Sequence, residues 1–283
     1  MIKVGFNVLA WSAGLPDTLL PITEKLKNIG YDGVEFALDH QGLDVYKRFN
    51  KHLSDLGLQS TCVIVMGPDE NPASDSAAVR AKALDSLRNY IDRAHALGAQ
   101  VMCGPFHSAF ATFSRKAPEE QEYQRSAEVL RAAGEYAAQA KLMLAPEALN
   151  RFECYLCNTM EQLVKLINRV DHSNVRAMFD THHANMEEKK FKTAIETVAP
   201  VLAHVHISEN DRGTPGDGHI QFDEVFATLA EVNYSGWLTI EAFTRSDPDF
   251  ANSINVWREY SKPWEMAENG LKFIKQMSQK YKL

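Results

Sequence analysis

Residues 33–65 read GVEFALDHQGLDVYKRFNKHLSDLGLQSTCVIV and contain one complete strand–helix–strand unit. The apolar run 33–38 predicts a strand, the helical periodicity of Leu43–Leu56 predicts a helix, and 59–65 predicts the next strand. Gly57 stands directly after the predicted helix, where glycine is the usual C-terminal cap. Because both strands are continuous apolar runs rather than alternating ones, they are typical of parallel strands that are buried on both faces.

The same unit recurs along the whole chain. The predicted strands are 3–8, 33–38, 59–65, 100–104, 142–145, 175–179, 202–207 and 237–240. The predicted helices are 15–29, 43–56, 75–97, 118–141, 160–170, 187–198, 222–232 and a long C-terminal segment that ends near Tyr281. Eight such units, with no linker rich in Pro, Gly or Ser between them, predict a single (β/α)8 TIM barrel of the α/β class over residues 1–283. A doubly wound open sheet is the alternative, but no phosphate loop or dinucleotide fingerprint follows the first strand.

The composition is that of an ordinary globular protein, with 283 residues of which 45% are hydrophobic and 24% are charged. A net charge of −7 argues against binding to nucleic acid or to an anionic membrane, because both require an excess of Lys and Arg. The sequence shows no apolar run long enough to span a membrane and no secretory signal. Four cysteines are too few for a disulfide scaffold, and Cys154 and Cys157 form only a lone CxxC, so we expect a cytoplasmic protein.

Four polar side chains stand at or near the ends of four successive predicted strands. Glu147 follows the fifth strand, Asp180 follows the sixth, His206 lies in the seventh and Glu241 follows the eighth. About one strand–helix unit separates each from the next. Because the carboxyl ends of the strands of such a barrel meet at the face that carries the active site, we expect the four side chains to surround one point.

Three carboxylates that converge in a partly desolvated site repel one another, and a divalent metal ion removes this cost. Carboxylates combined with one imidazole favour a fairly hard ion, which we predict to be Mn²⁺, with Co²⁺ or Mg²⁺ as alternatives. The predicted ligands are Glu147, Asp180, His206 and Glu241. The competing interpretation is that each acidic residue is an ordinary exposed charge at a strand end, and the regular spacing of the four counts against it.

Further polar residues carry weaker individual signals. Glu35 ends the second predicted strand, where a structural hydrogen-bonding role is expected. His183 could face the predicted site, whereas His182 is equally well explained as a surface or packing residue. The Gly-rich loop 208–218 lacks the Gly-Lys-Ser/Thr of a phosphate loop, so we interpret it as a flexible lid from which Arg212 could reach a substrate.

A metal ion flanked by two glutamates suits proton transfer at a carbon next to a carbonyl group. The ion would stabilise the charge of the enediolate, and a carboxylate base would remove the proton. If Glu147 and Glu241 lie on opposite faces of the substrate, one can remove the proton and the other can return it. Such a pair inverts a stereocentre.

The segments that carry these residues resemble the D-tagatose 3-epimerase family of ketose 3-epimerases, which includes D-psicose (allulose) and L-ribulose 3-epimerases. This family belongs to the xylose-isomerase-like barrels. The resemblance rests on PEALNRFE (146–153), FDTHHANMEE (179–188), HVHISEN (204–210), Arg212, PGDG (215–218), Glu241 and CGPFHS (103–108), and it covers essentially the whole chain.

The resemblance implies a Mn²⁺- or Co²⁺-dependent epimerase that acts at C3 of free ketohexoses or ketopentoses such as D-tagatose, D-fructose, D-psicose or L-ribulose. It also implies a homodimer or homotetramer. The family's metal ligands correspond to Glu147, Asp180, His206 and Glu241, and its acid/base residues to Glu147 and Glu241. Its residues that contact the substrate near O1 to O3 correspond to Glu153, His183 and Arg212, and an apolar pocket receives the far end of the sugar.

Other functions are compatible with parts of this pattern. An aldose–ketose isomerase of the hydroxypyruvate or xylose isomerase type would use similar residues to move a proton between C1 and C2. A keto-glycoside or keto-inositol substrate is a related alternative. An endonuclease IV-type enzyme would need more histidine ligands and a basic DNA-binding face, which the net charge of −7 opposes. A silent sugar- or metal-binding protein would not need both Glu147 and Glu241.

Overall fold

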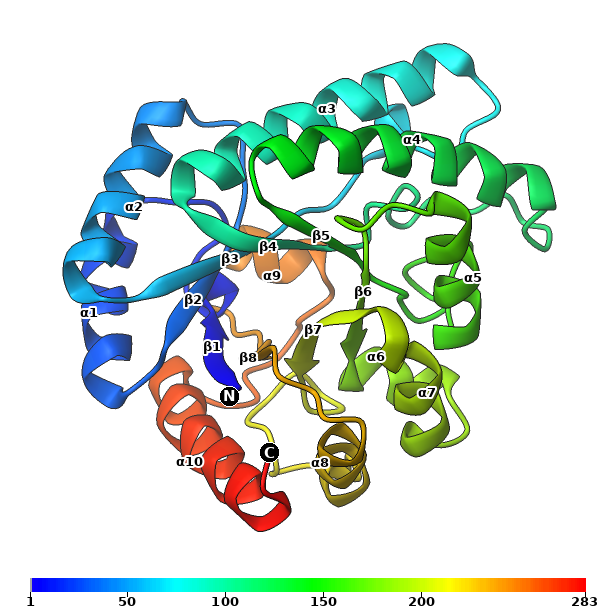
Figure 1. The fold of residues 1–283 in the computed structure, drawn as a ribbon. Helices are drawn as coiled ribbons and strands as arrows, with labels where there is room; N and C mark the ends of the chain where they lie inside the picture. Colours follow the sequence, from blue (N-terminus) through cyan, green and yellow to red (C-terminus); the bar gives the residue numbers. More distant parts are fainter. Residues whose placement is uncertain (1) are drawn as a thin grey trace.

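The computed structural model describes residues 2–283 and contains eight parallel strands surrounded by helices (Figure 1). The strands are β1 (Lys3–Asn7), β2 (Gly33–Ala37), β3 (Gln59–Val63), β4 (Ala99–Gly104), β5 (Met143–Pro146), β6 (Ala177–Asp180), β7 (Leu202–Ile207) and β8 (Trp237–Ile240). The helices are α1 (Leu20–Ile29), α2 (Leu43–Leu56), α3 (Ala77–Leu97), α4 (Glu120–Gln139), α5 (Met160–Val170), α6 (Thr181–Glu187), α7 (Phe191–Val198), α8 (Phe222–Glu231), α9 (Pro248–Ser253) and α10 (Pro263–Tyr281). The predicted (β/α)8 TIM barrel is confirmed.

The sheet closes on itself through the seam between β5 and β6. Hydrogen-bonded neighbours run in the order β5-β4-β3-β2-β1-β8-β7-β6. Across the seam, Leu144 pairs with Val175 and Glu147 pairs with Met178 in parallel bridges. The backbone N–H of Arg176 also donates to the carbonyl of Leu144 at 2.8 Å. Because the ring of strands is closed, the carboxyl ends of all eight strands meet at one face of the barrel.

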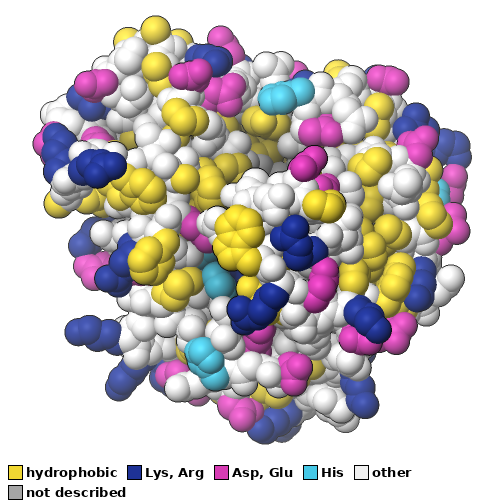
Figure 2. All heavy atoms as spheres, turned by 180° about the vertical axis from the view of Figure 1, so that it is seen from behind, with side chains coloured by type: hydrophobic (Ala, Val, Ile, Leu, Met, Phe, Trp, Pro, Cys, Tyr) yellow, Lys and Arg dark blue, Asp and Glu magenta, His cyan; other side chains and the backbone are white. Residues whose placement is uncertain are grey.

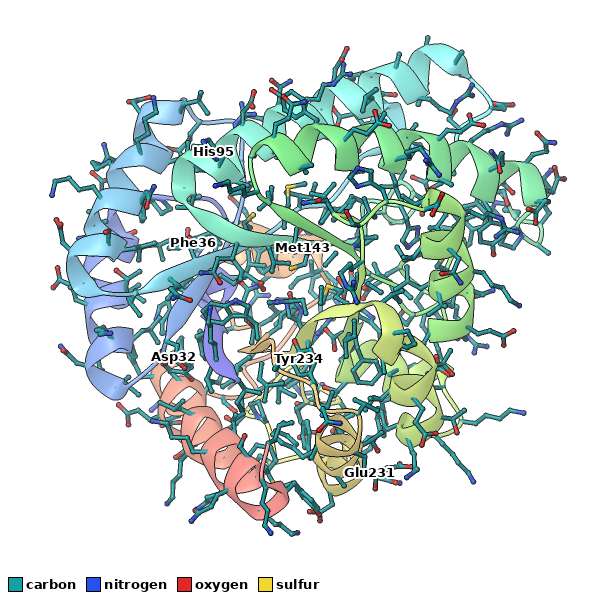
Figure 3. All side chains as sticks on the ribbon, in the orientation of Figure 1. Asp32, Phe36, His95, Met143, Glu231 and Tyr234 are labelled. Carbon is teal, nitrogen blue, oxygen red and sulfur yellow. The ribbon has the colours of Figure 1, made fainter. Side chains whose placement is uncertain are left out.

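The helices cover the outer face of the barrel and end where the sequence signals predict. Helices α1, α2 and α3 each end at a glycine in the left-handed conformation, with φ of 111° at Gly30, 66° at Gly57 and 74° at Gly98. Phe36 of β2, which Figure 3 labels, packs edge-on against Phe49 of α2. Their ring centroids are 5.6 Å apart. Within residues 2–283, no helix has the length and apolar character that crossing a membrane requires.

Three segments differ from the sequence-based expectation. The predicted helix 15–29 is α-helical only from Leu20, after a short 3-10 helix at Asp17–Leu19. The predicted helix 187–198 is only α7, and the additional helix α6 begins directly at the end of β6. Asp180 caps α6, because its side chain accepts the backbone N–H of His182 at 2.6 Å. The C-terminal segment is divided into α9 and α10, each of which begins at a proline, Pro248 and Pro263. Proline favours the first turn of a helix and cannot continue a preceding one.

The amino end of the barrel is filled by Trp237, which is 4% exposed. Gly33 makes room for its ring. A Cβ atom at Gly33 would lie 2.5 Å from Cη2 of Trp237 and 2.5 Å from the carbonyl oxygen of Gln59. The first of these atoms belongs to the ring of a buried side chain and the second to the backbone of β3, so the carbonyl cannot move away without disturbing that strand.

We therefore expect Gly33→Ala to lower the free energy of unfolding by about 1–3 kcal/mol, the usual cost of overpacking. Urea unfolding of the purified variant measures this change. Gly67→Ala is the matched control, because a Cβ atom there would meet no other atom within 4 Å. Equal stability of the two variants would contradict this account of Gly33.

Candidate active site

Four buried side chains lie at the carboxyl ends of β5 to β8. Glu147 directly follows β5, Asp180 is the last residue of β6, His206 lies near the end of β7, and Glu241 directly follows β8. Their exposed fractions are 3%, 1%, 0% and 6%. The alternative interpretation as ordinary exposed charges is therefore wrong for all three acidic residues.

The structure brings these side chains around one point. Glu147, Asp180 and His206 each offer a ligand atom, and these atoms lie within 4.8 Å of one another. His206 Nδ1 lies 3.6 Å from Oδ2 of Asp180 and 3.4 Å from Oε2 of Glu241. Glu241 thus borders the same imidazole nitrogen, although its carboxylate is also paired with Arg212.

Two atoms at the centre of this group lack the partner that a buried polar atom needs. Glu147 Oε1 and His206 Nδ1 are both buried, and neither has a hydrogen-bond partner within the described part of the chain. Leaving such atoms unpaired is costly, and each such case needs an explanation. A divalent cation bound between the carboxylates and the imidazole would satisfy both atoms, and the mainly oxygen ligand set suits a fairly hard ion. The residues therefore fit the predicted metal ion.

The charges at this point are only partly balanced by the protein. Burial and the nearby charges of Asp180 and Glu241 raise the pKa of Glu147 well above its usual value. Burial also acts to raise the pKa of Asp180, but the Arg212 guanidinium and the imidazoles of His206 and His183 hold it well below its usual range. The single guanidinium of Arg212 therefore neutralises only part of the negative charge of several buried carboxyl groups. The remaining negative charge would attract a cation.

Arg212 is fixed in the loop that follows β7. Its Nη1 donates to Oδ2 of Asp180 at 2.8 Å and lies 2.9 Å from Oε2 of Glu241. The loop itself is organised by the buried carboxylate of Glu209, which accepts the backbone N–H of Gly216 at 2.9 Å and that of Ile220 at 3.0 Å. These contacts do not support the interpretation of the loop as a flexible lid, because the side chain of Glu209 holds its backbone from within and the carbonyl of Arg212 accepts the backbone N–H of Phe243 at 2.9 Å.

His183 and Glu153 lie next to the four central side chains. His183 Nε2 is 2.9 Å from Nη2 of Arg212, 3.6 Å from Oε1 of Glu147 and 3.9 Å from Oε2 of Glu153. On its other side, the ring is held by the backbone N–H of Asn150, which donates to Nδ1 at 3.2 Å. Glu153 is more accessible, with 36% of its side chain exposed, and burial raises its pKa. His183 is thus the histidine that contacts Glu147, Glu153 and Arg212.

A cavity of about 650 Å³ opens above these residues. Its polar side contains all the predicted substrate contacts and both predicted acid/base residues, namely Glu147, Glu153, His183, Arg212 and Glu241. Its other walls are mainly apolar and include Leu9, Leu38, Val63, Ile64, Phe110, Leu149, Phe243, Phe250, Ile254 and Val256. Seen from behind, the molecule has apolar side chains gathered around a hollow (Figure 2). The cavity lies within the size range of small-molecule sites.

The other residues with weaker sequence signals lie in or near the cavity or are buried. His182 lines the cavity, and its Nδ1 lies 3.1 Å from the carbonyl oxygen of Glu209. Cys154 and Cys157 are buried free thiols. Glu35 accepts several buried hydrogen bonds, which agrees with its expected role.

The sequence did not single out Asn7, Cys103 or His204, which lie close to the site. His204 and His206 belong to the same strand two positions apart, and this alternation places them on one face.

The chain resembles sugar epimerases in sequence and structure. Residues 23–277 match the family described as xylose isomerase-like TIM barrel. A D-psicose 3-epimerase of Agrobacterium fabrum is 31% identical over 96% of this chain and 98% of its own length. The structure of an L-ribulose 3-epimerase superposes with a TM-score of 0.93 at 29% identity, covering 100% of this chain and 96% of the other. A D-psicose 3-epimerase from Clostridium cellulolyticum H10, solved with D-tagatose, has a TM-score of 0.89 at 26% identity and covers 99% of both chains.

The candidate metal centre predicts that divalent cations stabilise the fold. After removal of bound metal with EDTA, Mn²⁺ at 100 times its dissociation constant should add about 2.7 kcal/mol to the free energy of unfolding. Asp180→Asn should abolish this gain, because it removes one ligand charge while asparagine retains the helix cap. Thermal unfolding with and without Mn²⁺ measures both effects.

Glu120→Gln is the control for this experiment, because Glu120 pairs with Arg169 on the outer surface of the barrel. It should keep the full stabilisation by Mn²⁺. An Asp180→Asn variant that also keeps it would remove Asp180 from the ligand set.

Proposed function

The chain belongs to the xylose isomerase-like TIM barrel family, and we propose that it is a metal-dependent 3-epimerase of free ketohexoses or ketopentoses. The observation that carries the proposal is the placement of Glu147 and Glu241. They follow β5 and β8, two strands that are separated in the barrel by β6 and β7, so they flank Asp180 and His206 from opposite sides. Both line the same cavity. The similarity to D-psicose and L-ribulose 3-epimerases supports the same activity.

In the proposed centre, Glu147, Asp180, His206 and Glu241 hold the divalent ion, which we take to be Mn²⁺, with Co²⁺ or Mg²⁺ as alternatives. When bound, the ion supplies Lewis-acid stabilisation of the negative charge that develops on the ketose oxygens. The ligand set supports a hard ion because three of its four members are carboxylates. The two unpartnered buried atoms, Glu147 Oε1 and His206 Nδ1, support binding between these residues.

The two glutamates perform the proton transfers. One carboxylate removes the proton from C3, which gives an enediolate across C2 and C3, and the other delivers a proton to the opposite face of C3. Because each residue can act as acid or base, the same pair serves both directions of the reaction. His183, Arg212 and Glu153 lie beside the pair and are proposed to hold O1 to O3 of the sugar, which fixes C3 between the two carboxyl groups.

The cavity supports an uncharged sugar rather than a sugar phosphate. The charged side chains that line it are the acidic Glu147, Glu153, Asp211 and Glu241 and the basic Arg212. Arg212 is already paired with two carboxylates. A phosphate group on the far carbon of the sugar would therefore meet apolar or acidic surroundings, without a free cation among the lining residues to bind it.

For location and assembly, we propose a cytoplasmic homodimer or homotetramer, as the family resemblance implies. Phe152 and Trp257 are 73% and 67% exposed and supply apolar surface that a second copy could cover.

The proposed substrates are D-tagatose, D-fructose, D-psicose and L-ribulose. Relatives named for D-psicose and L-ribulose support this choice.

With Mn²⁺ and D-fructose, the enzyme should form D-psicose and, in deuterium oxide, place deuterium at C3. Glu147→Gln and Glu241→Gln should each lower turnover by about 10²- to 10⁴-fold, the usual contribution of a general acid or base. Chromatography and NMR of the products measure both outcomes. Glu196→Gln, on the surface of α7 beside Lys192, is the control and should be fully active. Formation of an aldose without the C3 epimer would overturn the proposal in favour of an aldose–ketose isomerase.

The charge of the cavity predicts discrimination against phosphorylated sugars. D-Fructose 6-phosphate should have a kcat/KM at least about tenfold below that of D-fructose, which corresponds to ~1.4 kcal/mol. Steady-state kinetics with the two sugars under the same Mn²⁺ concentration test this expectation. A preference for the phosphorylated sugar would contradict the assignment of free ketoses as substrates.

A further inference from the structure

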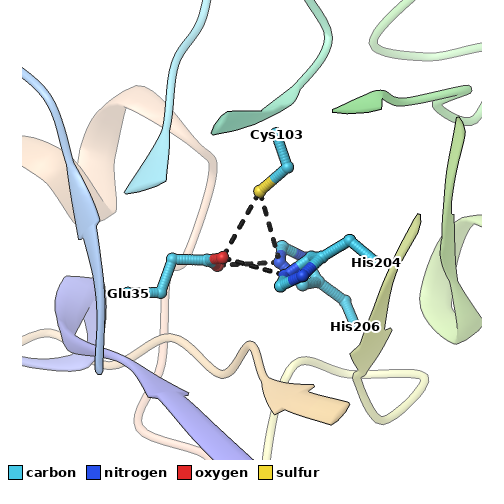
Figure 4. Close-up of side chains that lie close together, drawn as sticks. All are labelled: Glu35, Cys103, His204 and His206. Atoms are coloured by element: carbon cyan, nitrogen blue, oxygen red, sulfur yellow. Dashed lines mark hydrogen bonds and ion pairs between the residues drawn. The ribbon is translucent and has the colours of Figure 1, made fainter. Parts of the chain in front are cut away.

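A group of buried polar side chains lies directly beneath the candidate metal ligands and is centred on Glu35 of β2. Glu35, Cys103, His204 and His206 converge from three strands, and each offers a polar atom within 4.8 Å of the others (Figure 4). Glu35 is 0% exposed, as are His204 and His206. A carboxylate at this depth is tolerated only when hydrogen bonds or charges surround both of its oxygens.

The two oxygens of Glu35 face different partners. Oε1 is 2.7 Å from Nε2 of His206 and accepts a hydrogen bond from Nδ2 of Asn7 at 3.0 Å. Oε2 accepts a hydrogen bond from Oγ1 of Thr61 at 2.8 Å and lies 3.3 Å from Sγ of Cys103 and 2.9 Å from Nε2 of His204. Each oxygen therefore accepts a hydrogen bond from a donor of the protein, from Asn7 at Oε1 and from Thr61 at Oε2. His204 lies beside Oε2 but makes no hydrogen bond to it.

The contact with Glu35 determines which nitrogen of His206 is available to the candidate metal centre. Nε2 is engaged by Oε1 of Glu35, whereas Nδ1 faces Asp180 and Glu241 and has no hydrogen-bond partner in the described chain. A histidine ligand that donates its other N–H to a carboxylate is held in one tautomer and one ring orientation, and becomes a better donor to the metal.

The same oxygen of Glu35 also reaches a second candidate ligand. Nδ2 of Asn7 lies 3.0 Å from Oε1 of Glu35 and 3.3 Å from Oε1 of Glu241. The side chain of Asn7 is itself fixed, because its Oδ1 accepts the backbone N–H of Leu9 at 3.0 Å. Glu35 therefore contacts His206 directly and Glu241 through one bridging amide.

We propose that Glu35 is a positioning residue of the metal centre, which holds His206 directly and Glu241 through Asn7 and so sets the affinity for the divalent cation. The inference rests on the metal site of the proposed function, but not on the identity of the sugar. Glu35 touches neither the cavity nor the proposed substrate contacts, so it acts only through the ligands.

The test is a titration of the metal-free protein with Mn²⁺, followed by the EPR signal of the free ion. Glu35→Gln should weaken Mn²⁺ binding by about 10- to 100-fold, the usual effect of losing such a partner of a metal ligand. Thr61→Val is the matched control, because it removes one donor to Oε2 at the same depth and leaves the contact between Oε1 and His206 in place. It should bind Mn²⁺ with nearly wild-type affinity.

The unfolding temperatures of the metal-free wild-type and variant proteins are measured as well. They show whether a loss of Mn²⁺ affinity in Glu35→Gln comes from the position of the ligands or from a general loss of stability. If Glu35→Gln does not fold, Glu35→Asp replaces it, since it keeps the charge and withdraws the carboxylate from His206 by one methylene group. Wild-type affinity in a folded Glu35 variant would overturn the proposal, as would an equal loss in Thr61→Val. If the wild-type protein binds Mn²⁺ and Glu35→Gln binds it weakly, the proposal stands even when no sugar is epimerised. Failure of the wild-type protein to bind Mn²⁺ would overturn both the proposed function and this inference.

Discussion

The balance of charge at the carboxyl end of the barrel is the constraint on which the rest of the site depends. Glu35, Glu147, Asp180 and Glu241 are all buried, and all four lie around the imidazole of His206. The protein provides Arg212 and a few imidazoles to compensate them; Arg212 donates to Asp180, and His206 is engaged by Glu35 through Nε2. A buried carboxylate without compensation is strongly destabilising, so the arrangement is stable only with these partners and, in our proposal, a divalent cation.

This constraint connects the fold to the chemistry. Each of four neighbouring parallel strands places one side chain at the carboxyl end of the barrel. Two glutamates can therefore flank a metal centre that an aspartate and a histidine complete. The same closure buries the side chains of the candidate centre, with the mainly apolar cavity on one side and the network of Glu35 on the other. Proton transfer between the glutamates and C3 would then occur where electrostatic interactions are strong and few waters compete.

The sequence predicted the elements best where local signals are strong. Helices α2 and α5 have the predicted bounds, because apolar periodicity coincides with the left-handed Gly57 after α2 and with the Thr159 capping box before α5. Helix α6 was missed because its start depends on Asp180, whose side chain both caps the helix and belongs to the candidate metal centre. The network around Glu35 was missed for a similar reason: Asn7, Thr61, Cys103 and His204 are unremarkable in sequence, and only the closed ring of strands brings them to one carboxylate.

By itself, the sequence determined the barrel and the four residues at its strand ends, because the period of apolar runs and the spacing of polar residues after them are local properties of the chain. Only the tertiary structure decided how these residues meet. It placed Arg212 between Asp180 and Glu241, turned Nδ1 of His206 toward the carboxylates, and put Glu35 behind it. These relations join residues up to 171 positions apart, and they exist only because closure of the sheet brings β2, β7 and β8 into one ring.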